Sequence, residues 1–343
     1  MYKNFKRIVR LLLIVIISVL AYNYKLVGYG LSQGYGQFKI IWESRPVDEV
    51  LKDSRVADSL KLKLKLIQEI RRYAIDSIGV KDSKNYTTVY DQKGKPILWV
   101  VTACEPFDLV AYKWNFPFLG SVPYKGFFVK EKALKEKEEL EKKNYDTEIG
   151  TVSGWSTLGW FKDPILSNML FKSEGNVAEL IIHELTHATI YVEDSTDYNE
   201  NLATFIGKKG ALAFLKHKYG TDSKELKDYI FEMEDEDAFS AFVLKGALKL
   251  DSLYKSFKAD PSQDREKLKR FTITQIANSL DSSLFHNPSR YFKRINREKI
   301  NNAYFMSYKR YEEKQDDFEI EFEKKFKGDV KLFLKDMERK YGK

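Results

Sequence analysis

The residues of this sequence best suited to chemistry are two histidines and a glutamate spaced as HExxH: His183, Glu184 and His187. Residues four apart on a helix share one face about one turn apart, so the two imidazoles can converge on a single Zn²⁺ with Glu184 beside it. Burying these polar side chains in an apolar helix is costly unless a metal ion or hydrogen bonds satisfy them. The alternative is a core helix whose histidines only hydrogen-bond to the backbone.

A helix beginning near Asn176 is expected to position this motif. Asparagine is a residue type that caps helices, and Glu179 follows three residues later, as in a capping box. The positions that follow are mainly apolar around the whole helix, which predicts a buried element. Glu179 and Asp194 are candidate hydrogen-bond partners for the histidine ring nitrogens that do not face the metal.

Glu200 is the candidate for a third metal ligand. A polar turn separates the HExxH helix from a second helix, which is expected to start near Tyr198 or Asn199 and to carry Glu200 in its first turn. A helix, a reversal and a second helix bring this carboxylate back to the metal, and the result is a His₂Glu site with its fourth position open to water. The alternative is an acidic residue favoured by the helix N-terminus. No other histidine or cysteine lies nearby in the sequence to complete the site.

These residues predict metal-assisted hydrolysis of an amide bond. One Zn²⁺ per chain, held by His183, His187 and Glu200, would polarise the scissile carbonyl and lower the pKa of a bound water to near neutrality. Glu184 would take the proton of that water and pass it to the leaving amine, which requires a carboxylate that is not itself a ligand.

The segment HELTH followed by NENLATF resembles the gluzincin metallopeptidases, whose third zinc ligand is a glutamate in an NExxA-type helix. The whole chain resembles a bacterial family of predicted aminopeptidases, generally membrane-associated or lipoprotein-like. This resemblance rests on the HELTH block and on GQFKIIWESRPVDEVL, WNFPFLGSVPYKGFF, GWSTLGWFKDPILSNML and INNAYF. It implies a peptide substrate and a mainly helical α+β, gluzincin-like domain with a small β-sheet beside the HExxH helix. The sequence lacks the GxMEN block with which the best-known zinc aminopeptidases grip a free α-amino group.

The resemblance implies further site residues. In zinc peptidases of this type the strand before the HExxH helix borders the cleft, where an extended substrate can add to its edge. The positions that this places along the substrate are Gly154, Trp155, Ser156 and Thr157. Tyr304 or Tyr308 would supply the phenolic hydroxyl that gluzincins often use to stabilise the tetrahedral intermediate, and the sequence does not choose between them.

Residues 1–27 have the pattern of a secretory signal peptide or an uncleaved signal anchor. Four basic residues within the first ten precede an apolar run at residues 11–21. Neither an A-x-A cleavage site nor a cysteine follows the run, which favours the anchor. The expected location is the cell envelope, with the N-terminal segment in the membrane and the catalytic region on the periplasmic side.

Residues 28–343 are sufficient for one sizeable domain, in which residues 28–175 form N-terminal helices and a small sheet and residues 176–343 form the metal-site and C-terminal helices. The single cysteine, Cys104, excludes an intramolecular disulfide framework. The formal net charge of +8 is distributed over lysines that alternate with glutamates, and no nucleic-acid-binding motif accompanies it. The sequence indicates no oligomeric state.

Hydrophobic periodicity predicts the elements around the site. Residues 54–77 are expected to form an amphipathic helix and residues 222–257 a long helix. Residues 86–90 and 97–103 are expected to pair as a hairpin, and residues 149–160 to form the strand that precedes the HExxH helix.

Two other classes of function remain open. A zinc hydrolase that cuts internal peptide bonds or a cell-wall amide would use the same metal ligands. A membrane-anchored binding protein that holds zinc structurally would have no need of Glu184, because a structural zinc site has no open position and uses no general base.

Overall fold

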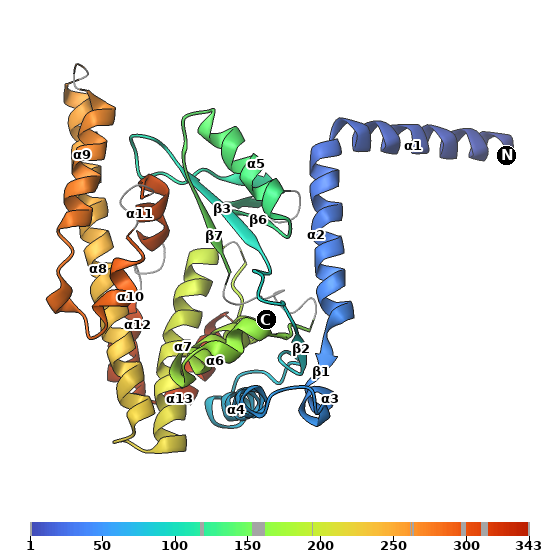
Figure 1. Ribbon diagram of the computed structural model, residues 1–343. Helices are drawn as coiled ribbons and strands as arrows, with labels where there is room; N and C mark the ends of the chain where they lie inside the picture. Colours follow the sequence, from blue (N-terminus) through green and yellow to red (C-terminus); the bar gives the residue numbers. More distant parts are fainter. Residues whose placement is uncertain are drawn as a thin grey trace.

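In the computed structural model the described part of the chain is mainly helical and contains three small sheets (Figure 1). This confirms the predicted mainly helical α+β fold class. The division of residues 28–343 into two parts of one domain stays a prediction. The structure describes residues 2–116, 120–152, 162–193, 195–260, 262, 264–295, 300–309 and 315–341.

The helices are α1 (Tyr2–Tyr22), α2 (Tyr24–Glu43), α3 (Val47–Lys52), α4 (Asp58–Tyr73), α5 (Lys130–Glu141), α6 (Glu174–Thr189), α7 (Thr196–Tyr219), α8 (Lys224–Ala259), α9 (Arg265–Asn278), α10 (Pro288–Phe292), α11 (Asn302–Lys309), α12 (Gln315–Phe326) and α13 (Val330–Tyr341). The strands are β1 (Arg45–Pro46), β2 (Thr88–Tyr90), β3 (Trp99–Cys104), β4 (Trp114–Phe116), β5 (Gly120–Val122), β6 (Lys125–Phe127), β7 (Asp146–Thr151) and β8 (Ile165–Leu166). Helix α4, with the π-helical turn after it, and helix α8 confirm the helices predicted at residues 54–77 and 222–257.

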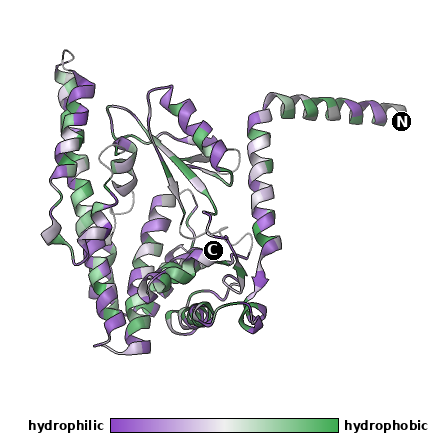
Figure 2. Ribbon diagram, viewed as in Figure 1, coloured by the Kyte–Doolittle hydropathy of each residue, from purple (hydrophilic) through white to green (hydrophobic). Residues whose placement is uncertain are grey.

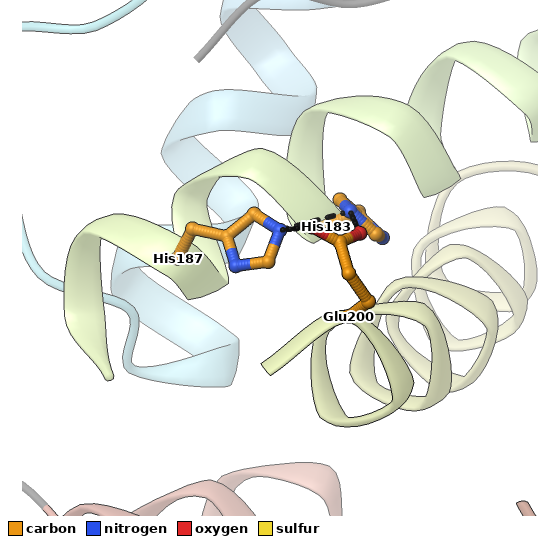
Figure 3. A group of neighbouring side chains, drawn as sticks. All are labelled: His183, His187 and Glu200. Carbon is orange, nitrogen blue, oxygen red and sulfur yellow. Dashed lines mark hydrogen bonds and ion pairs between the residues drawn. The ribbon is translucent and has the colours of Figure 1, made fainter. Parts of the chain in front are cut away.

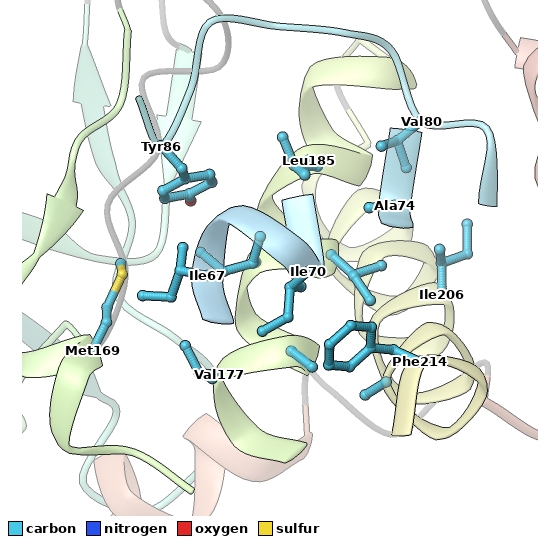
Figure 4. Packing of buried hydrophobic residues seen from close by; sticks show 14 of the residues in the cluster. Ile67, Ile70, Ala74, Val80, Tyr86, Met169, Val177, Leu185, Ile206 and Phe214 are labelled. Atoms are coloured by element: carbon cyan, nitrogen blue, oxygen red, sulfur yellow. The ribbon is translucent and has the colours of Figure 1, made fainter. Parts of the chain in front are cut away.

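Helix α6 lies in the main hydrophobic core, between α4 and α7 (Figure 4). It is buried on most of its circumference because its apolar residues recur on every side, as the sequence predicts. Ile67 and Ile70 of α4 pack in this core, and Ile206 and Phe214 of α7 belong to it as well. The helix that carries the HExxH motif is therefore held in a fixed position, which fixes the direction in which its side chains point.

Glycine allows α6 and α7 to approach closely beside the motif. A Cβ added at Gly207 of α7 would lie 3.0 Å from the carbonyl oxygen of Glu179 and 3.2 Å from the Cβ of His183. Only a residue without a side chain fits at this distance without displacing α7. The close approach sets the separation between the two helices that carry the candidate ligands.

The predicted hairpin is wrong. Strand β2 pairs antiparallel with β1 and parallel with β8, whereas β3 lies between β6 and β7 in a separate antiparallel sheet. The chain turns away after β2 because Gln92 is bound to the segment after β8: its backbone N–H donates to Ser167 Oγ (2.9 Å), and its Oε1 accepts from the N–H of Asn168 (3.0 Å). Two strand-like segments joined by a turn thus belong to different sheets.

A buried polar network joins the sheet to the C-terminal helices. Lys269 of α9 is 5% exposed, and its Nζ donates to Asp146 at the start of β7 (2.8 Å). The other carboxylate oxygen of Asp146 accepts from the backbone N–H of Asn302 (2.8 Å), whose side chain accepts from Tyr254 (2.6 Å) and donates to the carbonyl of Glu105 (2.9 Å). Asn302 in the NNAY block therefore packs helix α11 against the sheet.

Helix α1 extends away from the remainder of the molecule and is mainly apolar along its length (Figures 1 and 2). Within the described residues, no helix is both long enough and apolar enough to cross a bilayer. The anchor predicted for residues 1–27 stays a prediction.

Candidate metal centre

Helix α6 begins two residues before the predicted cap. Ser173 is the N-cap, and its Oγ accepts a hydrogen bond from the backbone N–H of Asn176 (3.3 Å). The predicted capping by Asn176 with Glu179 is wrong because Ser173 supplies an equally suitable side chain at the position where the backbone is still extended. Asn176 instead donates its side-chain amide to Glu232 of α8 (2.8 Å), which ties the start of α6 to a neighbouring helix.

Three of the predicted site residues meet between α6 and α7: His183, His187 and Glu200 (Figure 3). The Nε2 atoms of the two histidines are 3.1 Å apart. Each carboxylate oxygen of Glu200 lies 3.5 Å from one of these nitrogens, Oε2 from His183 and Oε1 from His187. All the candidate ligand atoms lie within 4.8 Å of one another. The structure thus brings together the three residues that the sequence proposed as ligands.

These separations match those of ligands around a tetrahedral ion. Nitrogen and oxygen ligands that lie 2.0–2.1 Å from a tetrahedral Zn²⁺ are about 3.3 Å apart. The distances of 3.1, 3.5 and 3.5 Å fall on either side of this value, and the two of 3.5 Å run to different carboxylate oxygens of Glu200. Two histidines and one carboxylate leave a fourth position for water or substrate, as in catalytic zinc sites. The donor set and its spacing therefore fit a single divalent ion.

Two hydrogen bonds between the first turn of α7 and the segment after α6 form a clamp that positions Glu200. Asn199 is 3% exposed and forms two hydrogen bonds with Val192: its Nδ2 donates to the carbonyl (2.7 Å) and its Oδ1 accepts from the N–H (2.8 Å). Helix α7 begins at Thr196, earlier than predicted, so Glu200 lies in its second turn. The clamp fixes the reversal of the chain one residue before the ligand.

Glu200 interacts favourably with both histidines. Burial alone would raise the pKa of Glu200, but its hydrogen bonds to His183 and His187 hold that pKa well below its usual value. Burial alone would lower the pKa of His183, whereas the carboxylates of Glu200 and Glu184 raise it. Glu200 is consequently a carboxylate throughout the physiological pH range, the form that binds a metal ion.

Glu184 lies beside this cluster and is free to accept a proton. Its side chain is nearly buried, at 9% exposure, and its Oε2 has no hydrogen-bond partner among the described residues. A carboxylate with an unoccupied oxygen next to a metal position is suited to general-base chemistry. This agrees with the role that the HExxH spacing predicts.

Thr204 of α7 takes the position in which Glu179 or Asp194 was expected. Its Oγ1 lies 3.5 Å from Nδ1 of His183, on the side of the ring away from the cluster. Glu179 instead accepts a hydrogen bond from the hydroxyl of Tyr229 (2.8 Å), and burial raises the pKa of its carboxyl group. Asp194 lies outside the described residues. The Nδ1 atom of His187 is buried without a partner in the described part of the chain.

A pocket of about 230 Å³ opens along α6 beside the cluster. His183 and Glu184 line it, together with Asn176, Glu179 and Leu180 of the same helix. Lys172, just before α6, and Arg290 of α10 complete the wall. Neither cation was foreseen, because nothing in the local sequence links a lysine before α6 to an arginine in a distant short helix.

The substrate positions predicted at Gly154, Trp155, Ser156 and Thr157 lie outside the described residues and stay a prediction. The strand expected over residues 149–160 is described as β7, which ends at Thr151.

Tyr304 and Tyr308 lie on α11, with ring centroids 5.5 Å apart, in the cluster packed against α8. Neither lines the pocket at His183 and Glu184. The hydroxyl of Tyr304 is buried with no partner in the described structure, and burial raises the pKa of both phenols. Their predicted part in stabilising the intermediate therefore stays a prediction.

The phenol of Tyr86 is an unsatisfied polar group near Glu184. Tyr86 is fully buried, its hydroxyl has no hydrogen-bond partner among the described residues, and burial together with the charges of Glu184 and Asp163 raises the pKa of its phenol well above the usual value. An unpaired buried hydroxyl destabilises the folded state. We expect Tyr86→Phe to raise the free energy of unfolding by about 1 kcal/mol, measured by urea denaturation.

Tyr229→Phe is the matched control for this prediction. Tyr229 is equally buried, but its hydroxyl donates to Glu179. Removing that donor leaves a buried carboxyl group without its partner, so the same change should lower the free energy of unfolding by about 1–3 kcal/mol. A loss of stability in Tyr86→Phe as large as that in Tyr229→Phe would show that the hydroxyl of Tyr86 is satisfied.

Two buried helices that place two histidines and a glutamate around one point, with a second carboxylate beside it, define a candidate metal-dependent hydrolase site. The comparison with protein families agrees with this class. The family model described as "Putative aminopeptidase" matches residues 28–341, and the chain belongs to that family. No curated protein and no solved structure matches the chain significantly.

Proposed function

We propose that this protein is a zinc-dependent peptidase of the gluzincin type, in which His183, His187 and Glu200 hold one Zn²⁺ and Glu184 is the general base. The observation that carries the proposal is the set of ligand separations, 3.1, 3.5 and 3.5 Å, between two imidazoles and a carboxylate. Membership of the family supports peptidase activity in general. The proposals of a bound zinc ion and of a general base come from the residues of the site.

In this mechanism a bound Zn²⁺ supplies Lewis acidity toward the scissile carbonyl and favours ionisation of a nearby water. Glu184 accepts a proton from the attacking water on its unpaired carboxylate oxygen and delivers that proton to the leaving amine. His183 and His187 stay in place because α6 is held in the core, and Glu200 because the Asn199 clamp fixes the turn before it.

We further propose that the enzyme removes residues from the N-termini of peptides, as the family description suggests. Its mode of gripping the terminal amino group differs from that of the best-known zinc aminopeptidases, because the GxMEN block is absent from the sequence. We place the catalytic part outside the cytoplasm, on the basis of the basic residues and apolar run within residues 1–27.

The test is to incubate the zinc-loaded protein with a mixed peptide library and to identify the products by mass spectrometry. Single residues released from peptide N-termini are the expected result. Internal cuts would make the enzyme an endopeptidase, and cleavage of peptidoglycan fragments alone would make it a cell-wall amidase. Zinc binding without cleavage of any of these substrates would contradict the proposed catalytic function.

A further inference from the structure

The pocket beside the metal centre contains a lysine whose ammonium group has no direct ion-pair partner among the described residues. Lys172 is half-buried at the pocket wall, and its ammonium group forms no hydrogen bond or ion pair within the described residues. Burial and the charge of Arg290 lower the pKa of Lys172, and the carboxylates of Glu179 and Glu232 offset this only in part. A partly desolvated ammonium in this position is stabilised if an anion enters the pocket.

Arg290 is held in the pocket wall by contacts with α8. Its Nη1 lies 3.2 Å from Oε1 of Glu232. The segment before Arg290 is fixed by Asp235, whose carboxylate accepts the backbone N–H groups of His286 (2.6 Å) and Asn287 (2.9 Å). Arg290 therefore needs little reorganisation to act on a ligand, since its helix is positioned before binding.

The acidic groups around the pocket are already engaged. Glu232 accepts hydrogen bonds from Ser173 (2.9 Å), Asn176 (2.8 Å) and Arg290. Glu179 accepts from Tyr229, and burial raises the pKa of its carboxyl group. Glu184 has the proposed role in proton transfer. The group that remains to be satisfied by a ligand is the ammonium of Lys172.

We propose that this pocket receives a carboxylate of the substrate beside the bond to be cleaved, held by Lys172 with Arg290. The inference rests on the proposed peptidase function, because the pocket is continuous with His183 and Glu184. Two sources can supply this chemistry: the side chain of an aspartate or glutamate next to the scissile bond, or the free C-terminal carboxylate of a short peptide.

The experiment compares four short peptides of one sequence. They carry either glutamate or its neutral isostere glutamine in the two residues flanking the expected cleavage site, and either a free or an amidated C-terminus. With the full-length zinc-loaded protein, the kcat/KM for the preferred carboxylate should exceed that for its neutral counterpart by about tenfold or more, the effect of one charge-assisted hydrogen bond. A preference for glutamate assigns the side chain, and a preference for the free acid over the amide assigns the C-terminus.

Variants at Lys172 test whether the preference for a carboxylate arises in this pocket. Lys172→Met should bring the ratio between acidic and neutral peptides close to one, and Lys172→Arg should retain most of it. Lys249→Met is the matched control, because it removes the same charge from an exposed site on α8 and should leave the ratio unchanged. Equal kcat/KM for all four peptides in the wild-type protein would overturn the inference while leaving the peptidase assignment intact.

A binding measurement separates this inference from the proposed function. Glu184→Gln protein, titrated with the same four peptides by calorimetry, should bind the preferred carboxylate about tenfold more tightly than its neutral counterpart. Adding Lys172→Met should remove that difference. If no peptide is cleaved but this difference in binding is found, the peptidase proposal fails and the carboxylate pocket stands. Equal affinity for acidic and neutral peptides overturns the pocket.

Discussion

Replacing Glu184 by glutamine is expected to reduce peptide hydrolysis by a factor of about 10²–10⁴ while the protein keeps its metal ion. The amide has nearly the same shape as the carboxylate but cannot accept the proton of the attacking water. Glu184 lies beside the three candidate ligands without belonging to their cluster, so its replacement leaves the ligand atoms in place. The measurements are kcat/KM on a peptide substrate and metal content by mass spectrometry.

Glu174→Gln is the matched control for Glu184→Gln, because it makes the same chemical change in the first turn of the same helix, outside the pocket. It should keep both the activity and the metal. Retention of metal-dependent activity in Glu184→Gln would contradict the assignment of this residue as the base. Loss of the metal in Glu184→Gln would show instead that Glu184 contributes to ion binding.

The second large effect is expected from removal of the metal. A ligand present at a hundred times its Kd stabilises the folded state by about 2.7 kcal/mol. For a domain of this size that corresponds to a fall in Tm of roughly 4 °C when a chelator removes the ion. Zinc added after the chelator has been removed should restore the original Tm, and differential scanning calorimetry measures both changes.

His187→Ala should make the Tm insensitive to the chelator, because His187 supplies one of the two imidazoles and its side chain is 5% exposed at the cluster. His217→Ala is the matched control, since His217 is exposed on α7 and contacts the ring of Tyr73. The control should respond to chelation as the wild-type protein does. An equal fall in Tm for His187→Ala and the wild type would contradict the assigned ligand.

Much of the site could be predicted because its information is local. Residues four apart on a helix share a face whatever the tertiary structure, so His183 and His187 follow from the sequence pattern once a helix is expected. Predicting Glu200 as a ligand required one further assumption, a short reversal of the chain between two helices. The structure contains that reversal. The long helices α4 and α8 were predicted for the same reason, since a periodic apolar face is a local signal.

The parts that could not be predicted depend on which distant segments of the chain pair with one another. Strands β2 and β3 were recognised as strands, but the hairpin was wrong because Gln92 binds Ser167 and Asn168, far along the chain. The same holds for the pocket, where Lys172 and Arg290 meet only because α8 holds both segments. Sequence reasoning assigned Glu179 to a histidine, whereas the available partner in space is Tyr229.

Signals for some of the missed residues were present in the sequence. Asn199 stands in the NENLA block directly before Glu200, where an asparagine near the start of a helix can bond to the backbone of the preceding segment. Gly207 interrupts an otherwise ordinary helix pattern one turn after Thr204, and a helical glycine suggests close approach of another element. Interpreting either signal correctly requires the position of α6, which is known only from the fold.

The most direct test of the metal centre is the zinc content of the purified full-length protein and of its Glu200→Ala variant, measured per chain by mass spectrometry after exhaustive dialysis against metal-free buffer. The geometry of His183, His187 and Glu200 predicts about one zinc ion per wild-type chain and a large loss in the variant. Equal zinc in both proteins would remove Glu200 from the ligands. No zinc in the wild-type protein after loading would contradict the metal centre itself.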